Sequence, residues 1–188
     1  RIQIRIKSSD PMEEKTPSIC DPPRARDLNL KILTCEILLG ITTPSSVPPN
    51  VLLETTNRCN WNCRQCPHSI GTGAYYADMS LGTVSKLEPA LLFSQFIEFG
   101  GLGEPTIGRH FAAISKLAVH SQCETYTLTN GSTLGHLDAL GSLKRVGISF
   151  DGDNKRTFEA LRLGADFDLL VQAIRDFGVR IKLNPNSA

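Results

Sequence analysis

From residue 51 onward, short apolar runs alternate with helix-like stretches. The apolar runs predict β-strands at Val51–Glu54, Phe96–Phe99, Thr125–Thr129, Arg145–Phe150 and Val179–Leu183. Between the strands, apolar residues recur every three to four positions, which indicates helices over Leu81–Leu91, Phe111–Ala118, Leu134–Leu140 and Phe158–Phe177. Ser80 is placed to cap the first of these helices. The alternation predicts parallel strands with right-handed crossovers, in five units that suit an α/β partial (β/α) barrel or an open doubly wound sheet.

The first 50 residues differ from the rest, because they contain seven of the eleven prolines. Proline interrupts helices and central strands, so we expect an extended leader here. Only Leu28–Leu39 has the spacing of a helix. We therefore predict a leader, a short helix and a linker over residues 1–50, and one core domain over residues 51–188.

Length and charge narrow the class of protein. A chain of 188 residues can bury a real hydrophobic core. A net charge of +1 predicts no binding of nucleic acid through a basic surface. No apolar run reaches the roughly 20 residues that span a bilayer, so we expect no membrane contact and a cytoplasmic, reducing location. Because position 1 is Arg rather than Met, we expect the sequence to be part of a longer protein.

Three cysteines follow the first predicted strand with the spacing C-x3-C-x2-C: Cys59, Cys63 and Cys66. A strand that ends in such a loop places several thiolates at one rim of a sheet. Three thiolates suit a [4Fe–4S] cluster with one iron left without a protein ligand. That iron is free to bind a substrate or cofactor.

Other readings of these cysteines stay open. Zinc is one, with His68 as the fourth ligand, although His68 lies closer to Cys66 than the usual zinc-finger spacing. Disulfides are another, but the sequence has no secretory signal and is not a short cysteine-rich scaffold. Plain buried cysteines are disfavoured by the polar neighbours Asn60, Arg64 and Gln65.

The other predicted strands also end in glycines or short polar residues. Carboxyl ends of strands gather the chemistry in a barrel, glycines allow a backbone to approach a ligand closely, and a carboxylate opposes a cation. Glycine and asparagine end strands in many proteins, so the complete set, and no single member, indicates a site. The candidates are Gly101, Gly103 and Glu104 after the second strand, Asn130 after the third, and Ser149 and Asp151 after the fourth.

These motifs, in this order, resemble those of the radical S-adenosylmethionine (radical SAM) superfamily over about residues 51–183. The cysteine spacing matches its defining motif. Further resemblances lie in Gly101-Leu102-Gly103-Glu104-Pro105, Thr129-Asn130-Gly131, Ser149-Phe150-Asp151-Gly152, and the SPASM-like run from Thr157 to Asp168.

The resemblance implies a TIM-like partial barrel, usually of six βα units, and a radical SAM enzyme. Its [4Fe–4S] cluster, held by the three cysteines, would reductively cleave S-adenosylmethionine to a 5′-deoxyadenosyl radical. That radical would abstract hydrogen from a substrate, which we expect to be a peptide or protein, with small-molecule cofactor biosynthesis as the alternative. A flavodoxin- or ferredoxin-like electron donor is implied as a partner.

The resemblance also assigns roles to residues. Gly103 and Glu104 would receive the amino group of S-adenosylmethionine, beside Gly101, and Arg162 would grip its carboxylate. Asn130, Ser149 and Asp151 would serve the ribose or the carboxylate, and no catalytic residue is expected beyond the cluster ligands.

Two features depart from the family. Gln65 stands where many members have an aromatic residue, and no cysteine-rich SPASM extension follows. A zinc-binding interaction module and an inactive fragment of a radical SAM protein are therefore kept as alternatives.

Overall fold

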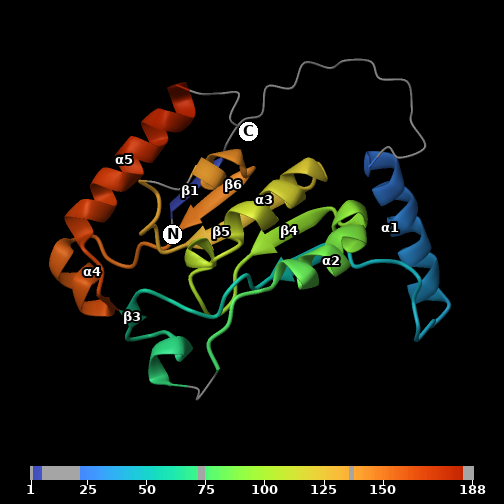
Figure 1. Cartoon of the computed structure of the whole chain (residues 1–188), viewed down its shortest axis with the longest axis horizontal. Helices are drawn as coiled ribbons and strands as arrows, with labels where there is room; N and C mark the ends of the chain where they lie inside the picture. The colour runs from blue at the N-terminus through green and yellow to red at the C-terminus, as the bar shows by residue number, and fades with distance from the viewer. Residues whose placement is uncertain (1, 6–21, 72–74, 136–137, 184–188) are drawn as a thin grey trace.

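The computed structural model describes residues 2–5, 22–71, 75–135 and 138–183. Its centre is a five-stranded sheet with the strand order β1-β6-β5-β4-β2, in which β1 spans Ile2–Arg5 (Figure 1). Four strands are parallel: β2 (Asn50–Leu53), β4 (Phe96–Phe99), β5 (Glu124–Thr129) and β6 (Arg145–Ile148). The predicted α/β class with parallel strands is therefore confirmed, and the first four strands lie within two residues of their predicted bounds.

The helices alternate with these strands. They are α1 (Pro22–Leu38), α2 (Leu81–Phe93), α3 (Phe111–His120), α4 (Lys155–Leu161) and α5 (Phe167–Leu183), and α1 and α5 lie at opposite ends of the molecule in Figure 1. Ser80 caps α2 as predicted, because its side chain accepts a hydrogen bond from the backbone N–H of Thr83. Short 3₁₀ helices occupy Pro67–Ile70, Pro105–Ile107 and Asp138–Ser142.

The core forms between the sheet and its helices. Ile97, Phe99, Ile114, Ile148 and Phe158 are completely buried. They come from strands and helices whose apolar faces meet, so burial of these side chains fixes the register of the sheet. The carboxyl ends of the four parallel strands are thereby held at a common edge.

The predicted fifth strand, Val179–Leu183, is wrong: these residues are the last part of helix α5. A strand there would need the free edge of β6, and that edge is taken by β1 (Ile2–Arg5), which pairs with β6 in the antiparallel sense. The helical alternative buries Phe177 in the core and packs Ile181 against it. The sheet therefore has four parallel strands rather than five.

Two further expectations need correction. The stretch predicted as helix Leu134–Leu140 is, in its described residues, a turn followed by the 3₁₀ helix Asp138–Ser142. Helix α1 begins at Pro22, six residues before its predicted start, because proline is tolerated in the first turn of a helix. The strand β1 was not expected at all. Among the described residues, no helix has the length and apolarity to cross a membrane.

Candidate functional site

The carboxyl ends of the parallel strands surround a cavity of about 320 Å³. The predicted site residues come from five separate segments of the chain, and the structure places all of them on the wall of this cavity. They are Cys59, Cys63, Cys66, Gly101, Gly103, Glu104, Asn130, Ser149, Asp151 and Arg162. Their roles toward a ligand stay predictions.

The loop that carries the cysteines is anchored by main-chain hydrogen bonds. A two-residue strand, β3 (Asn62–Cys63), pairs in the antiparallel sense with β7 (Arg162–Leu163), opposite residues about a hundred positions later. The Arg64 N–H donates to the Leu161 carbonyl at 2.9 Å, and the Cys66 N–H donates to the Cys63 carbonyl at 3.1 Å. The loop therefore turns the three thiols toward the same cavity.

The donor set fits a cluster better than a single ion. In the described parts of the chain, no group of three or more His, Cys, Asp or Glu could hold one metal ion. Zinc needs its ligands about 2.0–2.3 Å from one point, whereas a cubane offers a separate iron to each thiolate. His68 does not line the cavity; its ring lies 5.5 Å from that of Tyr76. The arrangement therefore gives no support to the zinc alternative.

The thiols are held in a weakly polar environment. Burial raises the pKa of Cys59, and the charge of Glu104 raises it further. Burial also raises the pKa of Cys63, while the Arg162 guanidinium opposes this effect, with Nη1 3.9 Å from the Cys63 sulfur. A coordinated metal cation would instead lower the pKa of these thiols, because metal binding requires deprotonated thiols.

Glu104 is almost fully buried, and its carboxylate joins the ends of two strands. Oε1 accepts hydrogen bonds from the backbone N–H and hydroxyl of Thr106 and, at 2.6 Å, from the Thr129 hydroxyl. Oε2 accepts the Asn130 N–H, also at 2.6 Å. Burial raises the pKa of Glu104, and these hydrogen bonds act against that rise. Three of these donors act on Oε1 and one on Oε2, so most of the lone-pair positions of the carboxylate bind groups of the protein itself, an internal role that the sequence did not predict.

The glycines next to Glu104 are required by close backbone contacts. A Cβ on Gly103 would lie 2.4 Å from the Thr56 carbonyl oxygen and 2.5 Å from that of Arg58. Gly101 has a φ of 143°, and a Cβ there would meet the Glu54 carboxylate. The glycine-rich turn is therefore pressed against the segment that leads into Cys59.

Asp151 and Arg162 form an ion pair in the wall of the cavity. Asp151 Oδ2 also accepts a hydrogen bond of 3.0 Å from the Gln65 side chain. The Arg162 guanidinium carbon lies 5.9 Å from the ring centre of Trp61, a cation–π distance. Gln65, where many family members have an aromatic residue, thus supports Asp151, a contact that spacing alone did not reveal.

Asn130 and Ser149 complete the cavity wall. The Asn130 amide nitrogen donates to the Asn60 side chain at 2.8 Å, which ties the end of β5 to the cysteine loop. The Ser149 N–H donates to the Thr129 carbonyl at 2.9 Å. Sequence reasoning missed Asn60 because nothing in its position separates it from an ordinary loop residue.

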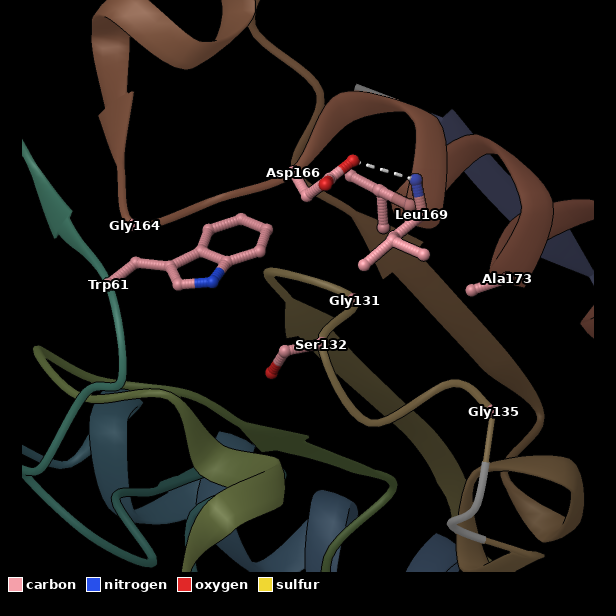
Figure 2. A pocket seen from close by; sticks show the side chains of 9 residues that line it. Trp61, Gly131, Ser132, Gly135, Gly164, Asp166, Leu169 and Ala173 are labelled. Atoms are coloured by element: carbon pink, nitrogen blue, oxygen red, sulfur yellow. Dashed lines mark hydrogen bonds between the residues drawn. The ribbon is translucent and has the colours of Figure 1, made fainter.

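A second cavity, of about 280 Å³, lies on the other side of the same loop. Figure 2 shows the Trp61 side chain pointing into the cavity, toward Gly131 and Asp166; Asp166 directly precedes α5 and accepts a hydrogen bond from the Leu169 N–H at 3.0 Å. Trp61 follows Cys59 by two positions, and Gly131 follows Asn130. The two cavities therefore share the loops that form their walls.

Comparison with known proteins gives one match in sequence and several in fold. No family model matches. The chain is 29% identical over 119 residues to the S-adenosylmethionine-dependent nucleotide dehydratase of Selenomonas ruminantium, covering 59% of this chain and 42% of that protein.

The similar solved structures share the fold at low sequence identity. Streptococcus suis SuiB bound to S-adenosylmethionine matches with a TM-score of 0.57 at 18% identity, covering 79% of this chain and 35% of that one. SuiB bound to the precursor peptide SuiA matches with a TM-score of 0.58 at 16% identity, covering 89% and 38%. The protein anSMEcpe with bound AdoMet and a Cp18Cys peptide gives 0.52 at 22% identity, covering 72% and 41%.

The chain spans less than half the length of these relatives. Within that span, its parallel strands and helices follow the arrangement of a partial TIM-like barrel. The predicted fold class is thus confirmed. The match in sequence to an S-adenosylmethionine-dependent relative, and the fold shared with structures that hold S-adenosylmethionine, support the predicted resemblance to the radical SAM superfamily.

Proposed function

We propose that this chain is the core of a radical SAM enzyme that holds a [4Fe–4S] cluster and S-adenosylmethionine in the 320 Å³ cavity. One observation carries the proposal. Three cysteines and seven further residues, predicted from motifs scattered between residues 59 and 162, line a single cavity. When bound, the cluster and S-adenosylmethionine would supply reductive cleavage to a 5′-deoxyadenosyl radical, which abstracts hydrogen from a substrate.

The chain's own residues would bind and position these groups. Cys59, Cys63 and Cys66 would ligate iron, and β3 pairing with β7 would hold their loop in place. Glu104 would oppose the positive charge of the ligand's amino group through its buried negative charge, while Thr106, Thr129 and Asn130 hold the carboxylate in place. Gly101 and Gly103 would let the backbone approach that group.

In the wall of the same cavity, Arg162 would meet the carboxylate of S-adenosylmethionine. Its Nε–H is buried and has no hydrogen-bond partner among the described residues, so the guanidinium keeps unused donor capacity. Asp151 would hold Arg162 in place from the other side. Asn130, Ser149 and Asp151 would offer hydrogen bonds to the ribose.

The proposal includes a peptide or protein as substrate, supported by SuiB, whose structure was solved with its precursor peptide. It includes an electron donor of the flavodoxin or ferredoxin class and a cytoplasmic location. It also treats residues 51–188 as the core, with residues 1–50 preceding it.

Anaerobic reconstitution with iron and sulfide tests the cluster directly. We expect about four irons and four sulfides per chain, as for one cubane. Replacing Cys59, Cys63 and Cys66 together with alanine should reduce bound iron to background, whereas the matched change of exposed Cys35 to serine should leave it unchanged. Near-zero iron together with stoichiometric zinc in the unaltered chain would refute the proposal.

Arg162→Gln tests the ligand side of the cavity. We expect roughly tenfold weaker binding of S-adenosylmethionine to the reconstituted chain, corresponding to one lost charge-assisted contact of about 1.4 kcal/mol. Equilibrium dialysis with labelled ligand measures this affinity. Arg156→Gln, which removes an exposed arginine on α4, is the control and should leave the affinity within twofold. Equal affinities for the two variants would remove Arg162 from the site.

A further inference from the structure

Helix α1 has an inverted distribution of polar and apolar residues. Its buried residues are polar: Arg26 is 8% exposed and Asn29 is 7% exposed. Its apolar residues face outward, with Leu28 59% exposed and Ile32 39% exposed. A surface helix normally turns its apolar stripe to the core. The exposed apolar face of α1 is therefore suited to contact with a second surface.

The orientation of α1 is fixed by specific hydrogen bonds. Arg26 Nη1 donates to the Gln122 carbonyl at 2.9 Å, just beyond the C-terminus of α3, where a cation is favoured. The Asn29 side chain accepts from the Val47 N–H at 2.9 Å and donates to the Val47 carbonyl at 2.8 Å. The outward direction of the apolar face is therefore set by the polar contacts on the other side of the helix.

Four exposed residues and one half-buried residue have the spacing of a coiled-coil seam. The half-buried Ala25 and the exposed Leu28, Ile32, Cys35 and Leu39 are separated by steps of three, four, three and four residues, which is the a and d pattern of two heptads. Helix α1 ends at Leu38, so four of these five residues lie within the helix and Leu39 directly follows it.

A groove continues this seam onto the body of the domain. It has a volume of about 190 Å³, and its lining includes Leu28 and Ile32 of the seam, Val47, and Phe93 at the end of α2. A helix lying on the seam would also cover this groove. The contact would then extend beyond α1 itself.

The charges beside the seam distinguish two ways of pairing. In heptad terms Arg24 and Lys31 lie on one flank and Glu36 on the other. Hydrogen bonds from Ser46 and Ser45 lower the pKa of Glu36 to about 2, so it is ionised at neutral pH. Lys31 pairs with Asp27 of its own helix at 2.6 Å, and Glu36 accepts hydrogen bonds from Ser45 and Ser46, so both charges are held in place beside the seam. A parallel copy would bring the Lys31 charge near that of Glu36 five residues further along, as in parallel coiled coils, whereas an antiparallel copy would bring the basic flank against itself.

We propose that α1 is a self-association surface, which pairs in parallel with α1 of a second copy of this chain about a two-fold axis along the Leu28–Ile32–Cys35 seam. The contact is isologous, so the same residues act on both copies. Cys35, the exposed cysteine of the described residues, would then lie opposite Cys35 of the second copy.

Disulfide trapping and mass measurement test the pairing on the intact chain. Light scattering should give the mass of a dimer, and mild oxidation with diamide should give a Cys35–Cys35 cross-linked peptide identified by mass spectrometry. In the matched control, Cys35→Ser combined with Ile37→Cys moves the thiol to the other exposed side of α1. We expect it to cross-link at least tenfold more slowly.

A second variant separates pairing from folding. Leu28→Glu with Ile32→Glu alters only exposed seam positions, so circular dichroism should stay unchanged while the mass falls to that of a monomer. A chain that stays monomeric at about 100 µM without these changes would overturn the proposal. A dimer in which Ile37→Cys cross-links as fast as Cys35, or in which Cys35 does not cross-link, would also overturn it.

Discussion

Replacing Glu104 with alanine is expected to lower the free energy of unfolding by about 3–5 kcal/mol. The change removes the acceptor for two backbone N–H groups and two hydroxyls, and each buried donor left unpaired costs about 1–3 kcal/mol. We expect less than the summed cost of four unpaired donors, because water from the cavity can form hydrogen bonds with some of them. Urea unfolding followed by circular dichroism measures the loss.

Two variants place this value in context. Glu104→Gln keeps the size of the side chain but puts an NH₂ group where an oxygen accepted hydrogen bonds, so we expect about half the loss. Glu88→Ala removes an exposed glutamate from α2 and should change stability by no more than about 0.5 kcal/mol. If Glu104→Ala were as mild as Glu88→Ala, the four hydrogen bonds could not be holding the ends of β4 and β5 together.

The second large effect is expected for Gly103→Ala, at about 3 kcal/mol of lost stability. The added Cβ would lie 2.4 Å and 2.5 Å from two carbonyl oxygens of the backbone, and backbone cannot move aside as a side chain can. The Glu104 N–H also donates to the Arg58 carbonyl at 2.7 Å, so that bond would stretch as the segment moves. Because this segment leads into Cys59, iron content after reconstitution should fall together with stability.

The control is another glycine-to-alanine change in the same chain. Gly178 lies within α5, and a Cβ there would meet nothing within 4 Å. Alanine is the better helix former, so Gly178→Ala should raise stability by about 0.5–1 kcal/mol and leave iron content unchanged. Opposite signs for the two alanine variants would tie the cost at Gly103 to its close contacts; a stabilising Gly103→Ala would contradict the described packing.

Much of the fold could be predicted from the chain because local signals agreed with each other. The strand β4 and the helix α3 have apolar periodicity that matches their burial, and Ser80 stands where a cap is needed. The site residues could be predicted because each follows a strand, and carboxyl ends of parallel strands share an edge. Spacing could also locate the cysteine loop without any knowledge of its neighbours.

The predictions from sequence were wrong or incomplete where a segment distant in the chain determines the local structure. The alternation Val179, Ile181, Leu183 looks like a strand, but the sheet edge that it needs is occupied by β1. Two of the four hydrogen bonds to the Glu104 carboxylate come from Thr129 and Asn130, which lie about 25 positions later in the chain. The support of Asp151 by Gln65 joins residues that no periodic pattern relates.

The pairing of β1 with β6 has a consequence for how this molecule acquires its structure. Ile2 lies opposite Ile148 and Arg5 opposite Arg145, so β1 leaves the ribosome long before β6 and must wait for β6 before it can pair. Closing so long a loop is entropically costly, and contacts of this separation form late. During that interval the unpaired edge of β6 is the place where two nascent chains would adhere to each other.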